Sequence, residues 1–230
     1  MRVEPFSVGS VIHVVKRGAR GMEIVRDDSD RWRFVRTLYL LNDQYQDTDW
    51  TRSKFQKSIF ERPDHWPERR PLVSILAWTL MSNHFHLLLY EAQEGGTSKF
   101  MQRLCGSMTT HFNEKYNEQG SIFQGAYRSR TVDTDVYLRY VLAYILVKNV
   151  FELFPGGLSE AVKTFDIAWE WADTYPFSSF PTIAHGAESP IIDLDLLTEL
   201  GLRTNEFKRT AHDMLDAYSA RNLPSSVTLE

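Results

Sequence analysis

Residues 72–90, LVSILAWTLMSNHFHLLLY, hold two apolar runs separated by the polar turn MSN. Short apolar runs on either side of such a turn are typical of two antiparallel strands. In the second run His84 and His86 are two residues apart, so on a strand both imidazoles point to one face and Phe85 points to the other. This stretch therefore predicts a strand pair that carries two histidines on one face of a sheet.

The segments on either side of this pair complete the pattern. A β-branched run at 11–16 predicts an opening strand, and apolar spacing over 28–41 predicts a helix. Later residues predict helices over 97–112 and 134–151, with a short strand within 120–130 between them. The order βα, ββ, α, β, α predicts an α+β fold, with an antiparallel sheet and helices packed on one face.

Composition limits the class of protein. The chain has 230 residues, 43% of them apolar and 24% charged, which excludes a disordered, collagenous or coiled-coil chain. Its single cysteine, Cys105, excludes an internal disulfide and a cysteine-based zinc cluster. The N-terminus lacks the pattern of a signal peptide, and no window reaches 18 apolar residues. We expect a cytoplasmic protein with no membrane contact.

Charge and composition also divide the chain. Residues 1–150 carry 21 Lys and Arg against 17 Asp and Glu, a balance of +4, whereas residues 151–230 carry 5 against 13, a balance of −8. An anionic partner would therefore bind the first part. We predict one domain over 1–157 and an acidic, aromatic and helical extension over 158–230 that packs on it. Residues 42–70 are polar and contain prolines, and we interpret them as an insertion.

Two sets of residues can carry chemistry. His84 and His86 can chelate one divalent metal ion, or they can simply be polar residues on one face of a strand. They interrupt an otherwise apolar run, and buried imidazoles need a partner, which favours the metal. Tyr137, Tyr140 and Tyr144 have the spacing of an aromatic core stripe. A helical tyrosine can also attack a phosphodiester when a metal polarises the phosphate.

Several stretches, in order, resemble the single-tyrosine HUH transposases, which are IS200-like, and among them the REP-associated tyrosine transposases. They are IHVVKRGARG and DDSDRWRF near the start, WTLMSNHFHLLL, KFMQRLCGSMTTHFNEKY, GSIFQGAYRSR, DTDVYLRYVLAYILVKNV and the later YPFSSF. WTLMSNHFHLLL is similar to the family signature MPNHVHLLL, with Ser82 in place of the usual proline. The resemblance covers about residues 10–182.

The resemblance implies a ferredoxin-like sheet with the His-x-His strand at its centre. It implies His84 and His86 as ligands of Mg²⁺ or Mn²⁺, and Tyr144 as the nucleophile. Members of the family cut single-stranded DNA, often beside a hairpin such as a REP-like palindrome, through a 5′-phosphotyrosine, and they act as monomers or homodimers. His13, His111 and Asn83 are expected to have core, surface or turn roles only.

The chain departs from the family at one position. A polar residue one helical turn after the tyrosine often completes the metal site, but here that position is Lys148, and Asn149 follows it. A protonated lysine is a poor metal ligand. Asn149 could substitute through a local change in helix phase, two histidines could hold the metal with water and phosphate, or Lys148 could bind the scissile phosphate. The last two are favoured.

Basic residues near the histidines are candidates for DNA contact. Arg128 and Arg130 follow Tyr127, and Arg17 and Arg20 follow the first strand. Arginines that alternate with aromatic residues suit phosphate contact and base stacking, although a solvated strand edge has the same composition. Two other functions remain open: a domesticated hairpin-binding protein without cleavage, and a hydrolase that uses the His-x-His metal on a small phosphate ester.

Overall fold

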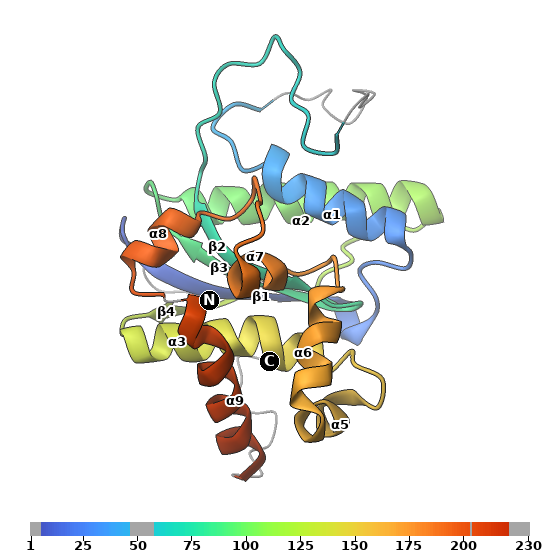
Figure 1. The fold of residues 1–230 in the computed structure, drawn as a ribbon. Coiled ribbons are helices and arrows are strands. Elements are labelled where there is room, and N and C mark those ends of the chain that lie inside the picture. Colours follow the sequence, from blue (N-terminus) through green and yellow to red (C-terminus); the bar gives the residue numbers. More distant parts are fainter. Residues whose placement is uncertain (1–5, 47–57, 203, 221–230) are drawn as a thin grey trace.

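The computed structural model describes residues 6–46, 58–202 and 204–220, and Figure 1 shows their arrangement. The strands are β1 (Val11–Arg17), β2 (Ser74–Leu80), β3 (His84–Tyr90) and β4 (Arg128–Val132). The first helical elements are η1 (Ala19–Gly21), α1 (Asp28–Leu40) and α2 (Gly96–Tyr116). The long helix after β4 comprises α3 (Asp135–Ala143), η3 (Tyr144–Lys148) and α4 (Asn149–Phe151). The extension contains α5 (Gly157–Lys163), α6 (Phe165–Asp173), α7 (Phe180–His185), α8 (Leu194–Glu199) and α9 (Thr204–Ala220).

The four strands form one antiparallel sheet with the order β2-β3-β1-β4. Together with α1 between β1 and β2, and α2 between β3 and β4, this is the ferredoxin-like topology. The expected α+β class and the element order are therefore confirmed. The strand with both histidines, β3, lies between β2 and β1, so it is internal.

Helices cover both faces of the sheet (Figure 1). On one face α1 and α2 pack as expected, and the ring of Phe34 in α1 lies 5.1 Å from that of Phe85 in β3. The opposite face is covered by η3, where the hydroxyl of Thr79 in β2 donates to the carbonyl of Ile145 at 2.7 Å. The expectation of helices on one face thus holds only for α1 and α2. The apolar side chains of 141–151 are buried against the second face of the sheet, because α1 and α2 already cover the first.

Local sequence explains where the helices begin. Asp27 caps α1 by accepting from the backbone N–H of Asp30. Thr134 caps α3 in the same way, by accepting from the backbone N–H of Tyr137. Gly18 ends β1 where a Cβ atom would lie 2.0 Å from the carbonyl oxygen of Met22, so only glycine fits there.

The extension lies along the outer edge of β2. Backbone hydrogen bonds join Leu80 to Phe177, Trp78 to Ser179 and Ile75 to Asp193, at 2.9, 2.9 and 3.0 Å.

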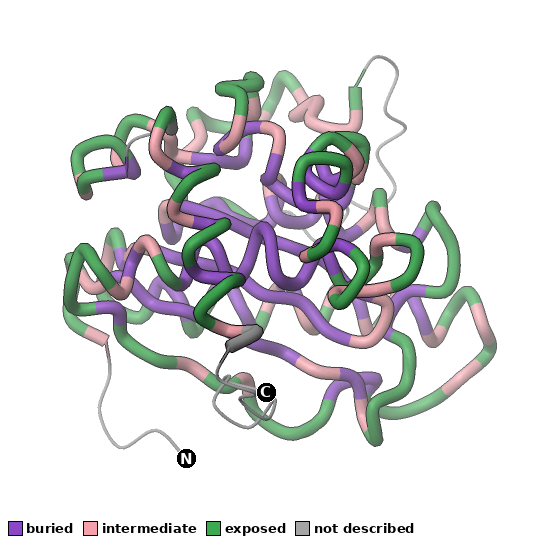
Figure 2. The backbone as a smooth tube through the Cα atoms, turned by 60° about the horizontal axis from the view of Figure 1, so that its bottom comes forward, coloured by how far each residue is buried: buried purple, intermediate pink, exposed green. Residues whose placement is uncertain are grey.

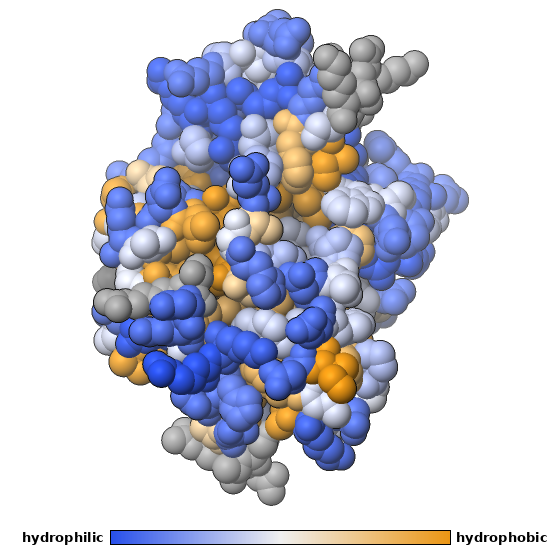
Figure 3. Space-filling view, viewed as in Figure 1, coloured by the Kyte–Doolittle hydropathy of each residue, from blue (hydrophilic) through white to orange (hydrophobic). Residues whose placement is uncertain are grey.

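The strands at the centre of the sheet are buried, as the purple core of Figure 2 shows. The face drawn in Figure 3 mixes hydrophilic and hydrophobic areas.

The insertion is only partly described. Residues 42–46 and 58–70 contain no helix or strand, and residues 47–57 lie outside the described part of the chain. No helix within the described ranges combines the length and apolar character that crossing a membrane requires.

Candidate functional site

The site is built around three histidines on one face of the sheet. Because Val15 in β1 pairs with His86 in β3, alternation along both strands places His13, His84 and His86 on the same face. Nε2 of His13 lies 3.0 Å from Nδ1 of His86, and the two rings stack. His13 is therefore part of the cluster, which corrects the expectation of a role outside it.

Hydrogen bonds fix which ring nitrogens face inward. Nδ1 of His84 donates to the side-chain oxygen of Asn83 at 2.6 Å, which leaves Nε2 as the basic nitrogen of a neutral His84. His86 uses its Nδ1 toward His13, and its Nε2 is buried with no hydrogen-bond partner among the described residues. Asn83 thus orients His84 in addition to its role in the turn. The buried Nε2 of His86, which has no hydrogen-bond partner among the described residues, is a suitable metal ligand.

His13 and His86 are uncharged at neutral pH. Burial, with Arg130 nearby, lowers the pKa of His13 to about 3. Burial also lowers the pKa of His86 well below its ordinary value, and the nearby His13, His84, Lys148 and Arg17 lower it further. Neutral imidazole is the form that binds metals, so the electrostatics of the cluster suit ligation.

Tyr144 lies against this cluster at the start of η3. Its ring centre is 5.6 Å from that of His86 and 6.1 Å from that of His13, both in edge-on arrangements. Tyr137 and Tyr140 lie earlier on the helix, where Tyr140 is 37% exposed. Of the three tyrosines, Tyr144 is therefore the one that the fold places beside the two histidines.

The helix changes its phase at Tyr144. The backbone N–H of Asn149 bonds to the carbonyl of Tyr144, five residues earlier, so η3 is a π turn. The carbonyl of Ile145, which Asn149 would use in an α-helix, instead accepts the hydroxyl of Thr79. A π turn holds one extra residue, so Asn149 takes the position that the fourth residue after Tyr144 has in an α-helix. This is the local change in phase that the first of the three sequence alternatives requires.

Asn149 and Lys148 have different surroundings. Asn149 is fully buried, and neither its side-chain oxygen nor its nitrogen has a hydrogen-bond partner among the described residues. Lys148 is also buried, but its Nζ pairs with Glu152 at 2.8 Å and lies 4.9 Å from the ring centre of Tyr144. Since unpaired buried amides are rare, Asn149 is a candidate third ligand for a metal ion.

The arginines divide between two places. Arg130 pairs with His13 across β1 and β4, and Arg128 pairs with Val15, so both share the face of the histidines and both are exposed. Arg17 pairs with His84 on that face too. Arg20 lies in the exposed turn η1 with a positive φ of 56°. Three of the four arginines therefore border the cluster.

Within the described residues, no group of three His, Cys, Asp or Glu side chains is arranged to hold a metal ion. A metal at this site would need the amide of Asn149 or a non-protein ligand beside the histidines.

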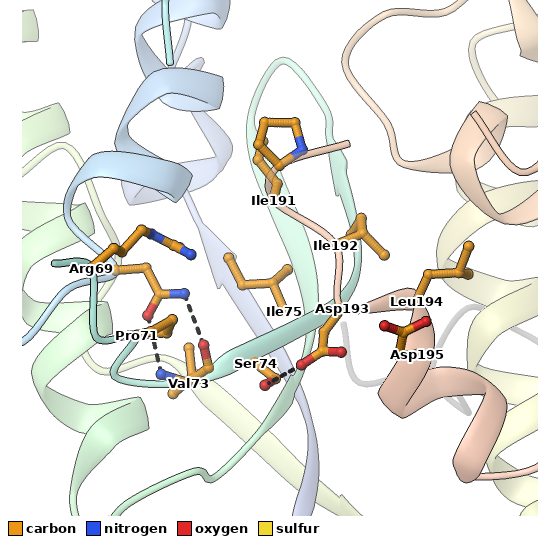
Figure 4. Close-up of a pocket in the computed structure, with 12 residues that line it drawn as sticks. Arg69, Pro71, Val73, Ser74, Ile75, Ile191, Ile192, Asp193, Leu194 and Asp195 are labelled. Carbon is orange, nitrogen blue, oxygen red and sulfur yellow. Dashed lines mark hydrogen bonds between the residues drawn. The ribbon is translucent and has the colours of Figure 1, made fainter. Parts of the chain in front are cut away.

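A pocket of about 310 Å³ lies elsewhere, where Arg69 and Ile75 meet Asp193 at the beginning of β2 (Figure 4). In it Asp193 accepts from Ser74 and caps α8, so its polar groups serve the fold.

The arrangement is that of a ferredoxin-like domain whose central His-x-His strand faces a helical tyrosine. Residues 43–148 match the family described as "Transposase IS200 like", and the resemblance found in the sequence is thereby confirmed over this segment. The segment includes His84, His86 and Tyr144, and it ends one residue before Asn149.

Among solved structures, the chain is similar to one described as a REP-associated tyrosine transposase bound to a REP hairpin. The identity is 14%, the match covers 83% of this chain and 88% of that chain, and the TM-score is 0.45. No curated protein matches the chain.

Proposed function

We propose that the protein is a metal-dependent single-stranded DNA endonuclease and strand transferase, a transposase that acts through Tyr144. The observation that carries the proposal is the position of the Tyr144 ring, 5.6 Å from the ring of His86, whose buried Nε2 has no hydrogen-bond partner in the described chain. A nucleophile beside a buried ring nitrogen that can bind a metal ion is the minimum that metal-assisted phosphoryl transfer requires.

The residues present fit a divalent cation such as Mg²⁺ or Mn²⁺. His84, His86 and the side-chain oxygen of Asn149 would hold it, and His13 and Asn83 would orient the two imidazoles through their hydrogen bonds. Once bound, the ion would withdraw charge from a non-bridging oxygen of the scissile phosphate.

The chain supplies the covalent step. Oη of Tyr144 loses its proton and forms a bond to phosphorus, while the bond from phosphorus to the 3′-oxygen breaks and that oxygen takes up a proton. The products are a 5′-phosphotyrosine and a free 3′-OH. Attack by another 3′-OH reverses the step and reseals the strand. The Nζ of Lys148, near the ring of Tyr144, places a positive charge beside the reacting phosphate.

For the substrate we propose single-stranded DNA beside a hairpin of the REP-like palindrome kind, in line with the IS200-like segment. The exposed Arg128 and Arg130 on the face of the histidines offer contacts for its phosphates. The protein would act as a monomer or as a homodimer.

The test is incubation of the purified protein with end-labelled hairpin oligonucleotides from the DNA that flanks its gene, with Mg²⁺, with Mn²⁺ and with EDTA. We expect a covalent protein–DNA band that requires the metal. Trypsin would release the adduct on residues 140–148, which contain Tyr140 and Tyr144, and fragmentation by mass spectrometry would assign the modified tyrosine. A band that persists in EDTA would contradict the metal-dependent mechanism.

A second candidate is a hairpin-binding protein that has lost cleavage. The observation that favours it is the burial of Tyr144, of which only 3% is exposed, beneath a lysine that already pairs with Glu152. Tight binding of several hairpins without any covalent band, in either metal, would support this function and exclude the transferase.

Replacing Asn149 by leucine tests the third metal ligand. Without metal, we expect the variant to keep or gain stability, because an unpaired buried amide costs about 1–3 kcal/mol. With metal, we expect the affinity for Mn²⁺ to fall by about 10-fold or more. Electron paramagnetic resonance titration with Mn²⁺ and thermal unfolding would measure the two effects.

Asn42→Leu is the matched control. Asn42 is equally buried, but its amide bonds to the backbone of Leu72 and Val73. Its replacement is expected to destabilise the protein and to leave Mn²⁺ affinity unchanged. Wild-type Mn²⁺ affinity in Asn149→Leu would show that the amide is not a ligand.

A further inference from the structure

The Arg–Tyr platform, defined here as Arg128, Arg130, Tyr137 and Tyr140, begins at the histidine cluster and leads outward. Arg130 is directly opposite His13 in the β1–β4 pair, and residues opposite each other on antiparallel strands point to the same face. The guanidinium carbon of Arg130 lies 4.9 Å from the ring centre of Tyr137. A series of neighbours therefore runs from His86 to His13, then to its cross-strand partner Arg130, and from Arg130 to Tyr137.

The series ends at an exposed aromatic ring. The rings of Tyr137 and Tyr140 are nearly parallel, with an angle of 17° and centres 6.4 Å apart. Tyr137 is partly buried and Tyr140 is 37% exposed. Tyr140 also lies one helical turn before Tyr144, whose backbone N–H bonds to the carbonyl of Tyr140. The aromatic surface thus adjoins the nucleophile along the helix as well as across the sheet.

We propose that the Arg–Tyr platform binds the single-stranded DNA next to the scissile phosphate, with a base stacked on Tyr140 and a phosphate bound by Arg130. This inference rests on the proposed function and adds to it the route of the strand. Every base has a flat face that can stack on a tyrosine, and stacking of this kind does not depend on sequence. In a duplex those faces are hidden, so the chemistry of the platform selects unpaired nucleotides.

The edge position of β4 supports the same occupant. β4 is the last strand of the sheet, and the side chains of Arg128 and Arg130 are both exposed. Two cations that repeat every second residue along an edge, beside stacked rings, form the alternation of charge and aromatic surface that tracks a nucleic acid backbone. A protein partner would instead need an apolar centre to bury, and two of the four residues of the platform are charged.

The experiment measures binding without chemistry. Fluorescence anisotropy in EDTA would follow a labelled hairpin oligonucleotide that has a single-stranded tail. We expect Tyr140→Leu to weaken binding by about 5- to 100-fold, the range that alanine substitution gives for one stacked base. Tyr140→Phe keeps the ring, so its Kd should stay within about two-fold of the wild-type value.

Tyr45→Leu is the matched control. Tyr45 is 38% exposed and also contacts an aromatic ring, that of Trp66, but it lies outside the platform. Its loss should leave the Kd unchanged. Arg130→Gln should reduce the slope of log Kd against log salt by about 0.7, the value for one phosphate contact on a single strand, whereas Tyr140→Leu should leave this slope unchanged.

Abasic substitutions along the tail locate the stacked base. If a base stacks on Tyr140, an abasic site at that base will raise the Kd of the wild type. On that oligonucleotide the Kd of Tyr140→Leu should then equal that of the wild type. Wild-type affinity in Tyr140→Leu, or an equal loss at every abasic position, would overturn the platform. If those results accompany a metal-dependent adduct, the proposed function stands and only the platform fails. If the wild type binds no single-stranded DNA, both fail.

Discussion

Tyr144→Phe is expected to abolish the covalent protein–DNA adduct and to change the Kd for single-stranded DNA by less than two-fold. Phenylalanine keeps the ring that packs against His86 and His13 and lies beneath the Nζ of Lys148. It removes only the oxygen that would form the bond to phosphorus. A denaturing gel with labelled oligonucleotide measures the adduct, and anisotropy measures the affinity.

Tyr127→Phe is the control for this variant. The phenol of Tyr127 lies 3.2 Å from the hydroxyl of Ser98 in α2, so it is on the other side of the sheet from the histidines. We expect its replacement to leave the adduct unchanged. An adduct of wild-type yield in Tyr144→Phe would assign the nucleophile to another residue, and a ten-fold loss of affinity would make the phenol a binding group.

Asp30→Ala is expected to reduce the free energy of unfolding by about 3–5 kcal/mol, the cost of removing one member of a buried charge network. The side chain of Asp30 is 1% exposed, and it accepts hydrogen bonds from Lys115, Tyr116 and His111 of α2. It also accepts from the backbone of Arg26 at the start of α1. Alanine would break the link between the two helices and leave Lys115 without this buried partner. Urea unfolding at pH 7 would measure the loss.

Asp28→Ala is the matched control on the same helix. Asp28 is 76% exposed, and its ion pair with Arg31 is a surface pair, so its loss should cost at most about 1 kcal/mol. Equal losses in the two variants would contradict a special role for Asp30.

The same carboxylate predicts how stability depends on pH. Burial alone would raise the pKa of Asp30, but hydrogen bonds from Lys115, the Arg26 backbone, Tyr116 and His111 outweigh it and lower the pKa. A carboxylate whose pKa is lower in the folded state adds stability above its unfolded pKa and loses it as the pH falls through the folded value. We therefore expect the wild type to lose more unfolding free energy than Asp30→Ala on acidification from pH 5 to pH 2.

The sequence predicts the histidine face because the rule behind it is local. Alternation along a strand places His84 and His86 together whatever the rest of the chain does. His13 follows the same rule within its own strand and interrupts an apolar run in the same way, so that signal was available. Its contact with His86 could not be predicted, because it depends on how β1 and β3 pair, and one sequence does not determine that register.

The π turn could not be predicted either. The spacing from Tyr144 to Asn149 does not fit an α-helix, and this misfit is visible in the sequence, but three explanations were compatible with it. The choice depends on Thr79, a residue 66 positions before Ile145 whose hydroxyl bonds to the carbonyl that the π turn releases. A contact over that distance along the chain arises only in the folded protein.

The backbone bonds between the extension and the outer edge of β2 have a consequence for protein synthesis. The four strands and the tyrosine helix are complete by Phe151, but the groups that cover the edge extend to Asp193, about 40 residues later. At a translation rate of about 5–20 residues per second, that gap corresponds to about 2–8 s. During this interval a nascent sheet would expose an unpaired strand edge, which neighbouring nascent chains on the same messenger RNA could pair with.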